Sequence, residues 1–347
     1  MSQRRRQQGF TLIELMIAGT LGLVLLLALV QLFLDNQRNR EQNRQLAGLQ
    51  DQGRYALAEL GRDLTMAGFW GGVFQGRQIT VAASAADALA GSADCGPGGA
   101  AGWAFLTTER VAFWDDAEEA AVTERFGCLA NLRAGTDVVA IRRVSGEAAL
   151  EADTCINAVL EPFHIYLKTN GVLGTLLRLT DPALDVCTGD EPLQAPVQFY
   201  TYLPRLYYVR DYAVTAGDGI PTLCRKTLSQ ANPAAMVDEC IAEGVEDLQI
   251  VWGIDSDGDA THAPDRYRSQ PDALELGRAV TAQIFLRVRA REPDPRHSDV
   301  KTYSYGDRSG DRVYVPRNAD AEADGTAPRR YYRRVFTTTV HLRNPLP

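Results

Sequence analysis

The chain opens with a long apolar run. From Phe10 to Leu34, 25 consecutive residues contain a single ionisable side chain, Glu14. About 20 apolar residues are enough for a helix to cross the hydrocarbon layer of a bilayer. The pattern therefore predicts one membrane-spanning helix over residues 10–34.

An amphipathic pattern follows this run without a break. Between residues 35 and 67, apolar side chains recur at helical spacing, while arginine, glutamine and acidic residues occupy the other faces. No proline interrupts this stretch, and Gly68, Gly71 and Gly72 then supply a stop signal. We expect the helix to continue to about Ala67, so that residues 35–67 form its amphipathic half.

Residues 68–347 carry strand patterns and predict a β-rich globular head. Residues 75–103 are rich in glycine and small side chains and predict a loop. Runs of β-branched and aromatic residues lie at 136–144, 163–168, 197–214 (interrupted by Pro204), 279–291 and 333–344. Candidate core residues are Val245, Leu248, Ile250 and Trp252 in a further strand, and Phe336, Thr338, Val340 and Leu342 on one face of the last.

These patterns predict an α+β fold, a long N-terminal helix packed on an antiparallel β-sheet. The clearest evidence is in residues 279–291, where apolar and polar side chains alternate. Such alternation is typical of antiparallel strands with one buried and one solvated face. We therefore expect Arg287, Arg289 and Arg291 to lie on the solvated face.

Charge and length restrict the class of protein further. The net charge is -8, and becomes -11 without Arg4, Arg5 and Arg6, which argues against a nucleic-acid partner for the head. The same arginines precede the span with no acid beside them, so the positive-inside rule places the N-terminus in the cytoplasm. The head then lies across the membrane, in the periplasm.

Six cysteines, all beyond the span, predict disulfides in an exported domain. Six cysteines allow 15 connectivities, and pairing of sequence neighbours is our hypothesis. The predicted pairs are Cys95 with Cys128, Cys155 with Cys187, and Cys224 with Cys240.

The leader differs from an ordinary secretory signal. Residues 1–9 form a short basic leader that ends at Gly9, and GFTLIE then begins the apolar run directly. A conventional signal is cleaved after its apolar stretch. The arrangement here resembles the type IV prepilin signal. That resemblance implies that the prepilin peptidase cuts between Gly9 and Phe10 and methylates the new N-terminus at Phe10, so that the span is retained.

Glu14 needs a partner in the membrane, because an acid at the centre of a membrane helix costs about 2.5 to 3.5 kcal/mol. Cleavage creates a cation on Phe10, one helical turn before Glu14. In pilins the corresponding glutamate is thought to meet the N-terminal amine of a neighbouring subunit. The resemblance therefore implies that Glu14 docks subunits together.

Internal stretches resemble the PilW-type minor pilins. They are residues 51–72, LCRKTL at 223–228, residues 243–267 and the terminal RRVFTTTVHLRN. The resemblance implies a single-pass inner-membrane protein that later joins the pilus, at its tip, on the cell surface. It also implies partners: other minor pilins, the major pilin, the prepilin peptidase, the inner-membrane assembly platform and membrane lipid.

An acidic turn follows the strand that begins at Val245. It carries Asp255, Asp257, Asp259 and, further on, Asp265. The spacing fails as an EF-hand, because Ala260 replaces the sixth-position glycine and Arg266 the twelfth-position glutamate. A looser carboxylate cage for Ca²⁺ is one interpretation, and an Asp-Gly turn without metal is the other. No other cofactor is expected.

Three other functions compete with that of a minor pilin. Catalysis is not expected, because His164, His262, His297 and His341 are scattered without metal-ligand spacing and catalytic motifs are absent from the sequence. A minor pseudopilin of a type II secretion system shares the leader, Glu14 and the helix. A tip adhesin would use exposed aromatic residues, and its candidates are Tyr200, Tyr202, Tyr207, Tyr208 and Tyr212.

The leader predicts the N-terminus of the mature chain. In cells with active prepilin peptidase, mass spectrometry of the N-terminal peptide is expected to show a chain that begins at methylated Phe10. A chain that still begins at Met1 would contradict this processing.

Overall fold

The computed structural model describes residues 11–89, 95, 102–124, 126–152, 160–179, 197–258, 263–306, 313–316 and 328–344. The chain divides into two compact units, Met1–Gly48 and Leu49–Pro347. The first holds most of the apolar helix, and the second holds the end of that helix with the head.

A single helix, α1 (Leu12–Thr65), runs through the predicted membrane and amphipathic halves. Its 54 residues correspond to about 80 Å at 1.5 Å per residue. The helix ends where the glycines begin: Gly68 has a φ of +74° and its N–H donates to the carbonyl of Arg142 at 2.9 Å. A left-handed residue at this point favours glycine and turns the chain into the head.

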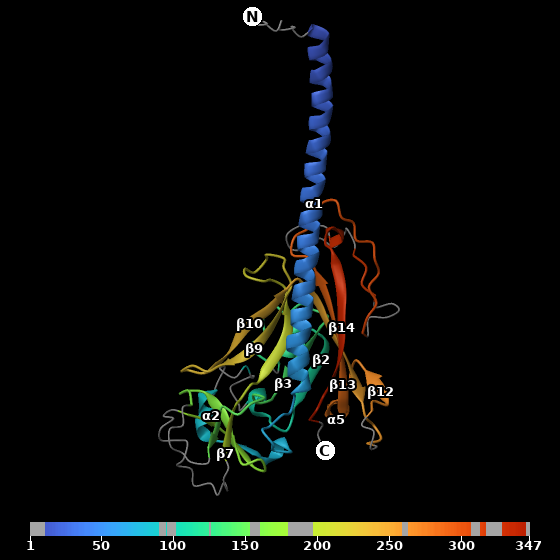
Figure 1. Ribbon diagram of the computed structural model, residues 1–347. Helices are drawn as coiled ribbons and strands as arrows, with labels where there is room; N and C mark the ends of the chain where they lie inside the picture. Colours follow the sequence, from blue (N-terminus) through green and yellow to red (C-terminus); the bar gives the residue numbers. More distant parts are fainter. Residues whose placement is uncertain are drawn as a thin grey trace, which may run out of the picture. The chain divides into compact units, whose positions relative to one another are not determined.

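The strands form three sheets in the second unit (Figure 1). The first has the order β1 (Ile79–Val81), β6 (Gly174–Arg178), β5 (Ile165–Thr169), β7 (Val197–Thr201) and β4 (Leu150–Ala152). The second has the order β10 (Ala235–Glu243), β9 (Thr222–Ser229), β8 (Arg205–Arg210), β3 (Thr136–Ile141) and β2 (Val111–Ala117). The third has the order β12 (Arg266–Arg268), β11 (Val245–Ile254), β13 (Ala279–Arg289) and β14 (Arg333–His341).

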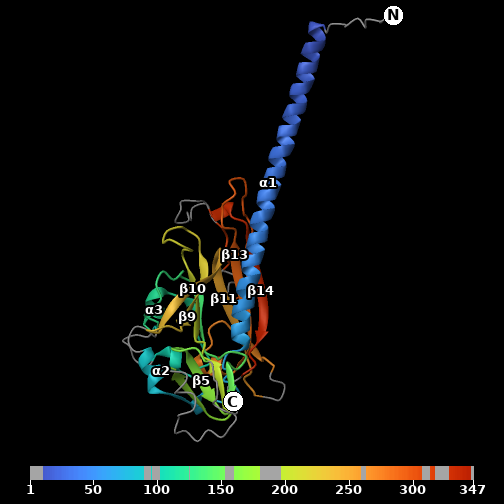
Figure 2. The same cartoon turned by 60° about the vertical axis from the view of Figure 1, so that its left-hand side comes forward.

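The α+β fold class is confirmed, with differences in detail. The head has three sheets where one was expected, and all pairs between named strands are antiparallel except the parallel β1–β6 pair. The expected loop over residues 75–103 is wrong in part, since it contains β1, α2 (Ala83–Ala88) and the start of a 3-10 turn at Trp103–Phe105. These elements escape the strand pattern because they are three to six residues long. Figure 2 shows α2 beside the first sheet.

The remaining short elements are α3 (Glu119–Thr123), α5 (Ala273–Gly277) and 3-10 turns at Gly76–Gln78 and Pro328–Arg330.

The second sheet separates two apolar cores. On one face, Val139 and Tyr207 join Leu60 of α1 and Ile284 of the third sheet. The strand core residues predicted at Val245, Leu248, Ile250 and Trp252 all belong to this cluster. The end of α1 therefore completes the core of the head.

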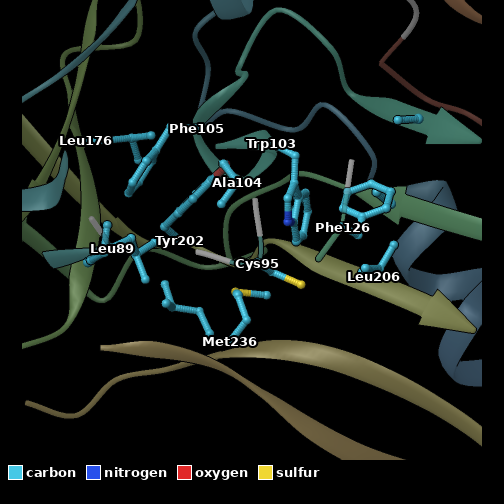
Figure 3. Packing of buried hydrophobic residues seen from close by; sticks show 14 of the residues in the cluster. Leu89, Cys95, Trp103, Ala104, Phe105, Phe126, Leu176, Tyr202, Leu206 and Met236 are labelled. Carbon is cyan, nitrogen blue, oxygen red and sulfur yellow. The ribbon is translucent and has the colours of Figure 1, made fainter. Parts of the chain in front are cut away.

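The other face of the second sheet packs on the first sheet and on loop residues. Figure 3 shows Tyr202, Trp103 and Phe126 together in this core. The Tyr202 hydroxyl donates to the carbonyl of Ala104. Of the tyrosines considered for adhesion, Tyr200, Tyr202, Tyr207 and Tyr208 are buried, so these side chains pack rather than face a ligand.

The expected solvated face of the strand arginines is wrong for two of three residues. Arg287 and Arg289 are buried, whereas Arg291 is exposed. Tyrosines of later segments cover this face: Arg287 Nη1 donates to the Tyr305 hydroxyl at 2.8 Å, and the Arg289 guanidinium lies 3.9 Å from the centre of the Tyr331 ring. Arg287 donates to Glu246 at 3.0 Å, and the alternation pattern could not reveal a buried counter-ion from another strand.

The contact of α1 with β14 is tight enough to exclude a side chain. A Cβ added at Gly53 would lie 2.5 Å from ring atoms of Phe336, which is itself buried on β14. A Cβ added at Gly48 would meet no described atom within 4 Å.

These two glycines predict opposite effects of the same substitution. Gly53→Ala is expected to lower the free energy of unfolding by about 1–3 kcal/mol, because overpacking displaces Phe336. Gly48→Ala is expected to be neutral or to stabilise by up to about 1 kcal/mol, because alanine is the better helix former. Thermal and urea unfolding of the detergent-solubilised chain would measure both. Equal effects at the two positions would contradict the close packing.

Candidate functional site

The apolar part of α1 is the first candidate site. Among the described residues, α1 is the one helix long and apolar enough to cross a membrane, and it lies near the N-terminus. Residues 12–34 lie almost entirely exposed, including aliphatic side chains such as Leu25 at 65%. Such a surface is stable in lipid or against other apolar helices.

Glu14 forms a capping box with Thr11 at the start of α1. The backbone N–H and the hydroxyl of Thr11 donate to Glu14 Oε2 at 3.0 and 2.9 Å, and the Glu14 N–H donates to Thr11 Oγ1 at 3.3 Å. This reciprocal arrangement satisfies donors that a helix start leaves unpaired. The T-x-x-E spacing was present in the sequence as the signal for it. Gly9 and Phe10 lie outside the described residues, so cleavage and docking stay predictions.

A second site lies where α1 meets the head, at the fully buried carboxylate of Asp63. Arg143 donates to Asp63 Oδ1 from Nε at 3.1 Å and from Nη2 at 2.6 Å. Arg205 Nη1 donates to Oδ2 at 2.6 Å, and the Tyr207 hydroxyl donates to the same oxygen. The helix is thus tied to β8 and to the segment after β3 by charge-assisted hydrogen bonds.

A neighbouring ion pair extends this contact by one turn of the helix. Arg225 of β9 donates from Nη1 to Glu59 Oε2 at 3.0 Å. The same guanidinium holds Glu239 of β10 in a bidentate pair at 2.8 and 3.0 Å. We call Glu59, Asp63, Arg143, Arg205 and Arg225 the helix–head ion cluster.

The charges of this cluster set the ionisation of Asp63. Burial alone would raise the pKa of Asp63, but Arg205, Arg143 and the Tyr207 hydroxyl outweigh it and hold that pKa below the ordinary value. Asp63 therefore stays ionised at neutral pH. Sequence reasoning missed the cluster, although an acid beside Leu60 and Leu64 on the apolar stripe was its available signal.

The structure brings together three of the four acids of the predicted calcium turn. Ligand atoms of Asp255, Asp257 and Asp265 lie within 4.8 Å of one another, and Asp259 lies outside the described residues. Asp265 Oδ2 already accepts from the N–H and hydroxyl of Ser256, at 2.6 and 2.9 Å, and Asp255 Oδ1 accepts from the Gly258 N–H. These bonds explain the turn without a cation, so Ca²⁺ binding stays a prediction.

Two of the three predicted disulfide pairs are present. Cys95 bonds to Cys128, and Cys224 bonds to Cys240 directly across the β9–β10 ladder. Cys155 and Cys187 lie outside the described residues.

The described histidines do not meet in one site. His164 lies beside Tyr166, His297 stacks on Tyr332 with ring centroids 3.9 Å apart, and His341 ends β14. His262 lies outside the described residues.

Two protein-family models match parts of the chain. Residues 4–30 match the model of the prokaryotic N-terminal methylation motif. With the apolar helix that begins inside the motif, this match fits a membrane-anchored pilin-like protein. Residues 206–344, about two fifths of the chain, match the family model described as Type IV Pilus-assembly protein W, PilW. Together the two matches support a type IV pilus minor pilin of the PilW type. Neither the curated proteins nor the solved structures yield a match.

The PilW match covers strands that contact α1. The matched region runs from β8 to β14, and so contributes the third sheet and Arg225 of the helix–head ion cluster. The two matches favour a structural protein that interacts with other pilus components and with the prepilin peptidase.

The helix–head ion cluster predicts a stability effect that depends on pH. Asp63→Asn leaves the buried Arg143 and the partly buried Arg205 without their counter-ion and is expected to cost about 3–5 kcal/mol at pH 7. Because the pKa of Asp63 is lower in the folded state than the unfolded value of about 3.9, this contribution is complete above about pH 4 and is lost as pH falls through the folded pKa.

Unfolding of the solubilised chain at pH 7 and at successively lower pH measures this difference. Asp51→Asn is the matched control, because Asp51 lies exposed on the same helix and is expected to change stability by under about 0.5 kcal/mol. A difference between wild type and Asp63→Asn that does not shrink in acid would contradict the role of the charge.

Proposed function

We propose that this protein is a minor pilin that primes assembly of the type IV pilus. It would act in an inner-membrane complex with other minor pilins, with its head in the periplasm, and then sit at the pilus tip. The observation that carries the proposal is the PilW match over β8–β14, in a chain whose methylation motif leads into an apolar helix.

The attachment of α1 to the head supports a role as a filament subunit. In a subunit anchored by its helix, a force on the helix has to reach the head. Asp63 and Glu59 bind the helix to three strands or their ends through arginine pairs no longer than 3.1 Å. The head and the end of α1 would then move as one piece during assembly.

Glu14 would have two roles in this scheme. The capping box with Thr11 stabilises the start of α1 within one chain. After cleavage, its carboxylate would also neutralise the N-terminal amine of a neighbouring subunit. The first role needs a hydrogen-bond acceptor, whereas the second needs a charge.

A deletion strain tests the priming role. Loss of the gene is expected to remove surface pili, measured as major pilin sheared from the cells, while the membrane pool of major pilin stays intact. Complementation with the wild-type gene should restore them. Normal pili in the deletion strain would overturn priming and favour a secretion pseudopilin or a dispensable tip subunit.

The two roles of Glu14 are separated by complementing the deletion with variants. Glu14→Gln keeps a side chain that can complete the capping box but removes the charge, and is expected to be processed normally yet to restore few pili. Thr11→Ala removes the cap and keeps the charge, and is expected to restore most pili. Equal defects in both variants would assign Glu14 to helix capping alone.

A further inference from the structure

The third sheet ends in a strand whose outer edge is open. β14 is the last strand in the order β12, β11, β13 and β14, and it lies beside α1 (Figures 1 and 2). Its nine residues pair with β13 in a register that has no shift from Arg333 to His341. On the side away from β13, β14 therefore has no strand partner within the described part of the chain.

The register fixes which backbone groups of β14 point outward. The Leu342 N–H donates to the Val280 carbonyl at 2.9 Å. The Ala290 N–H donates to the Tyr332 carbonyl at 2.8 Å. Because such bonds recur at every second residue of an antiparallel pair, the even-numbered residues of β14 bond to β13. The N–H and C=O groups of the odd-numbered residues then point away from the sheet.

Contacts within the chain close this edge at both ends and leave its middle open. At one end the Tyr303 hydroxyl donates to the Arg333 carbonyl at 3.5 Å, and at the other the Arg343 N–H donates to the Thr65 carbonyl at 3.4 Å. Between these contacts, the outward backbone groups have no hydrogen-bond partner among the described residues. They belong to Val335, Thr337, Thr339 and His341, whose side chains are exposed or, for Val335, half-buried. We call residues 335–341 the open edge.

The other described sheet edges of the head carry features that hinder the addition of a strand. β1, β4 and β12 have three residues each. β2 and β10 have register shifts in their pairing, and β10 also carries Asp238 and Glu239. Short strands, bulges and charges are the usual means by which proteins protect an edge. The open edge differs, because VFTTTVH contains no proline, acid, lysine or arginine and its pairing with β13 is regular.

The open edge is suited to one kind of ligand, an extended peptide. Apart from His341, its residues are valine, threonine and phenylalanine, which are enriched in strands. Its outward N–H and C=O groups extend over about 20 Å at about 3.4 Å per residue. Only another extended backbone presents acceptors and donors at the matching spacing, which is the basis of recognition by strand addition.

A symmetric pair of two open edges does not fit a membrane-anchored chain. A Cβ added at Gly53 would lie 2.5 Å from Phe336, and one added at Gly61 would lie 3.2 Å from Val340. The end of α1 therefore lies along β14 and runs in the same direction. A twofold axis that paired two copies of β14 antiparallel would set their helices in opposite directions, which two chains anchored in one membrane cannot adopt.

We propose that the open edge of β14 receives an extended segment of a different pilin, which adds a fifth strand to the third sheet. The inference rests on the proposed function in that it takes the donor of this segment to be another pilus subunit. The donor backbone pairs with the outward groups of Val335, Thr337 and Thr339. Docking then depends on the backbone of β14 more than on its side chains.

Photo-crosslinking in cells tests this docking in the full-length chain. p-Benzoylphenylalanine replaces His341 at the end of the open edge, and in a matched control it replaces Val237, which is 42% exposed on the edge strand β10. Position 341 is expected to give an adduct with a second, different chain that bears the N-terminal methylation motif. Position 237 is expected not to give this adduct.

Two substitutions of Thr337 separate the backbone from the side chain. Thr337→Pro removes an outward N–H and leaves the bonds to β13 in place, because edge strands tolerate proline on their open side. It is expected to reduce the adduct at position 341 by about fivefold or more, whereas Thr337→Ala keeps the backbone donor and should retain most of the adduct. The melting temperature of each solubilised variant shows whether it folds, and Thr339→Pro replaces Thr337→Pro if that variant does not.

Three results would overturn strand addition. The first is an adduct that the proline and alanine variants reduce equally, which would assign the contact to side chains. The second is an adduct only with a second copy of this chain, and the third is no adduct at position 341 beyond that at position 237.

Docking and priming can fail separately. If the deletion strain keeps its pili but the backbone-dependent adduct forms, the docking edge stands and the priming role falls. If the deletion strain loses its pili but position 341 gives no such adduct, priming stands and the docking edge is wrong.

Discussion

The buried carboxylate of Asp63 is the contact on which the arrangement of the head depends. A charge removed from water is tolerated only with full compensation, and here two guanidinium groups and a phenol provide it. Its partners lie on β8 and after β3, so the helix can occupy one rotation and one height against the second sheet. The apolar contacts of Leu60 and Leu64 alone would leave more freedom, because hydrophobic burial is not directional.

A second buried carboxylate paired with arginines lies on the face of the third sheet that points away from α1. Glu246 accepts from Arg287 and Arg333, which come from two neighbouring strands. Burial would raise the pKa of Glu246, but the arginines hold it far below its usual range. The head therefore uses paired buried ions, besides apolar packing, to fix which strands are neighbours. Both clusters draw residues from the region that matches PilW.

Sequence patterns predicted the parts of the fold that follow from local hydrophobic periodicity. The long helix, its glycine stop, the break at Pro204 and the inward face of β11 are visible in the spacing of apolar residues. Placement of Arg287 and Asp63 is not, because their burial depends on counter-ions far along the chain. Short elements such as β1 and α2 are too brief for a pattern. Of the candidate sites, the acidic turn was found as a cluster, whereas the helix–head ion cluster needed residues of α1, β8, β9 and the segment after β3 that only folding brings together.

The contact between Gly53 and Phe336 has a consequence for how the chain is made. The two residues are 283 positions apart, and synthesis and export deliver the first long before the second. Until β14 arrives, the part of the helix around Gly53 lacks its contact with Phe336. Closing such a long loop is slow and leaves apolar surface open to wrong contacts. A chain truncated by its last dozen residues would lack Phe336, and the helix surface around Gly53 would stay exposed.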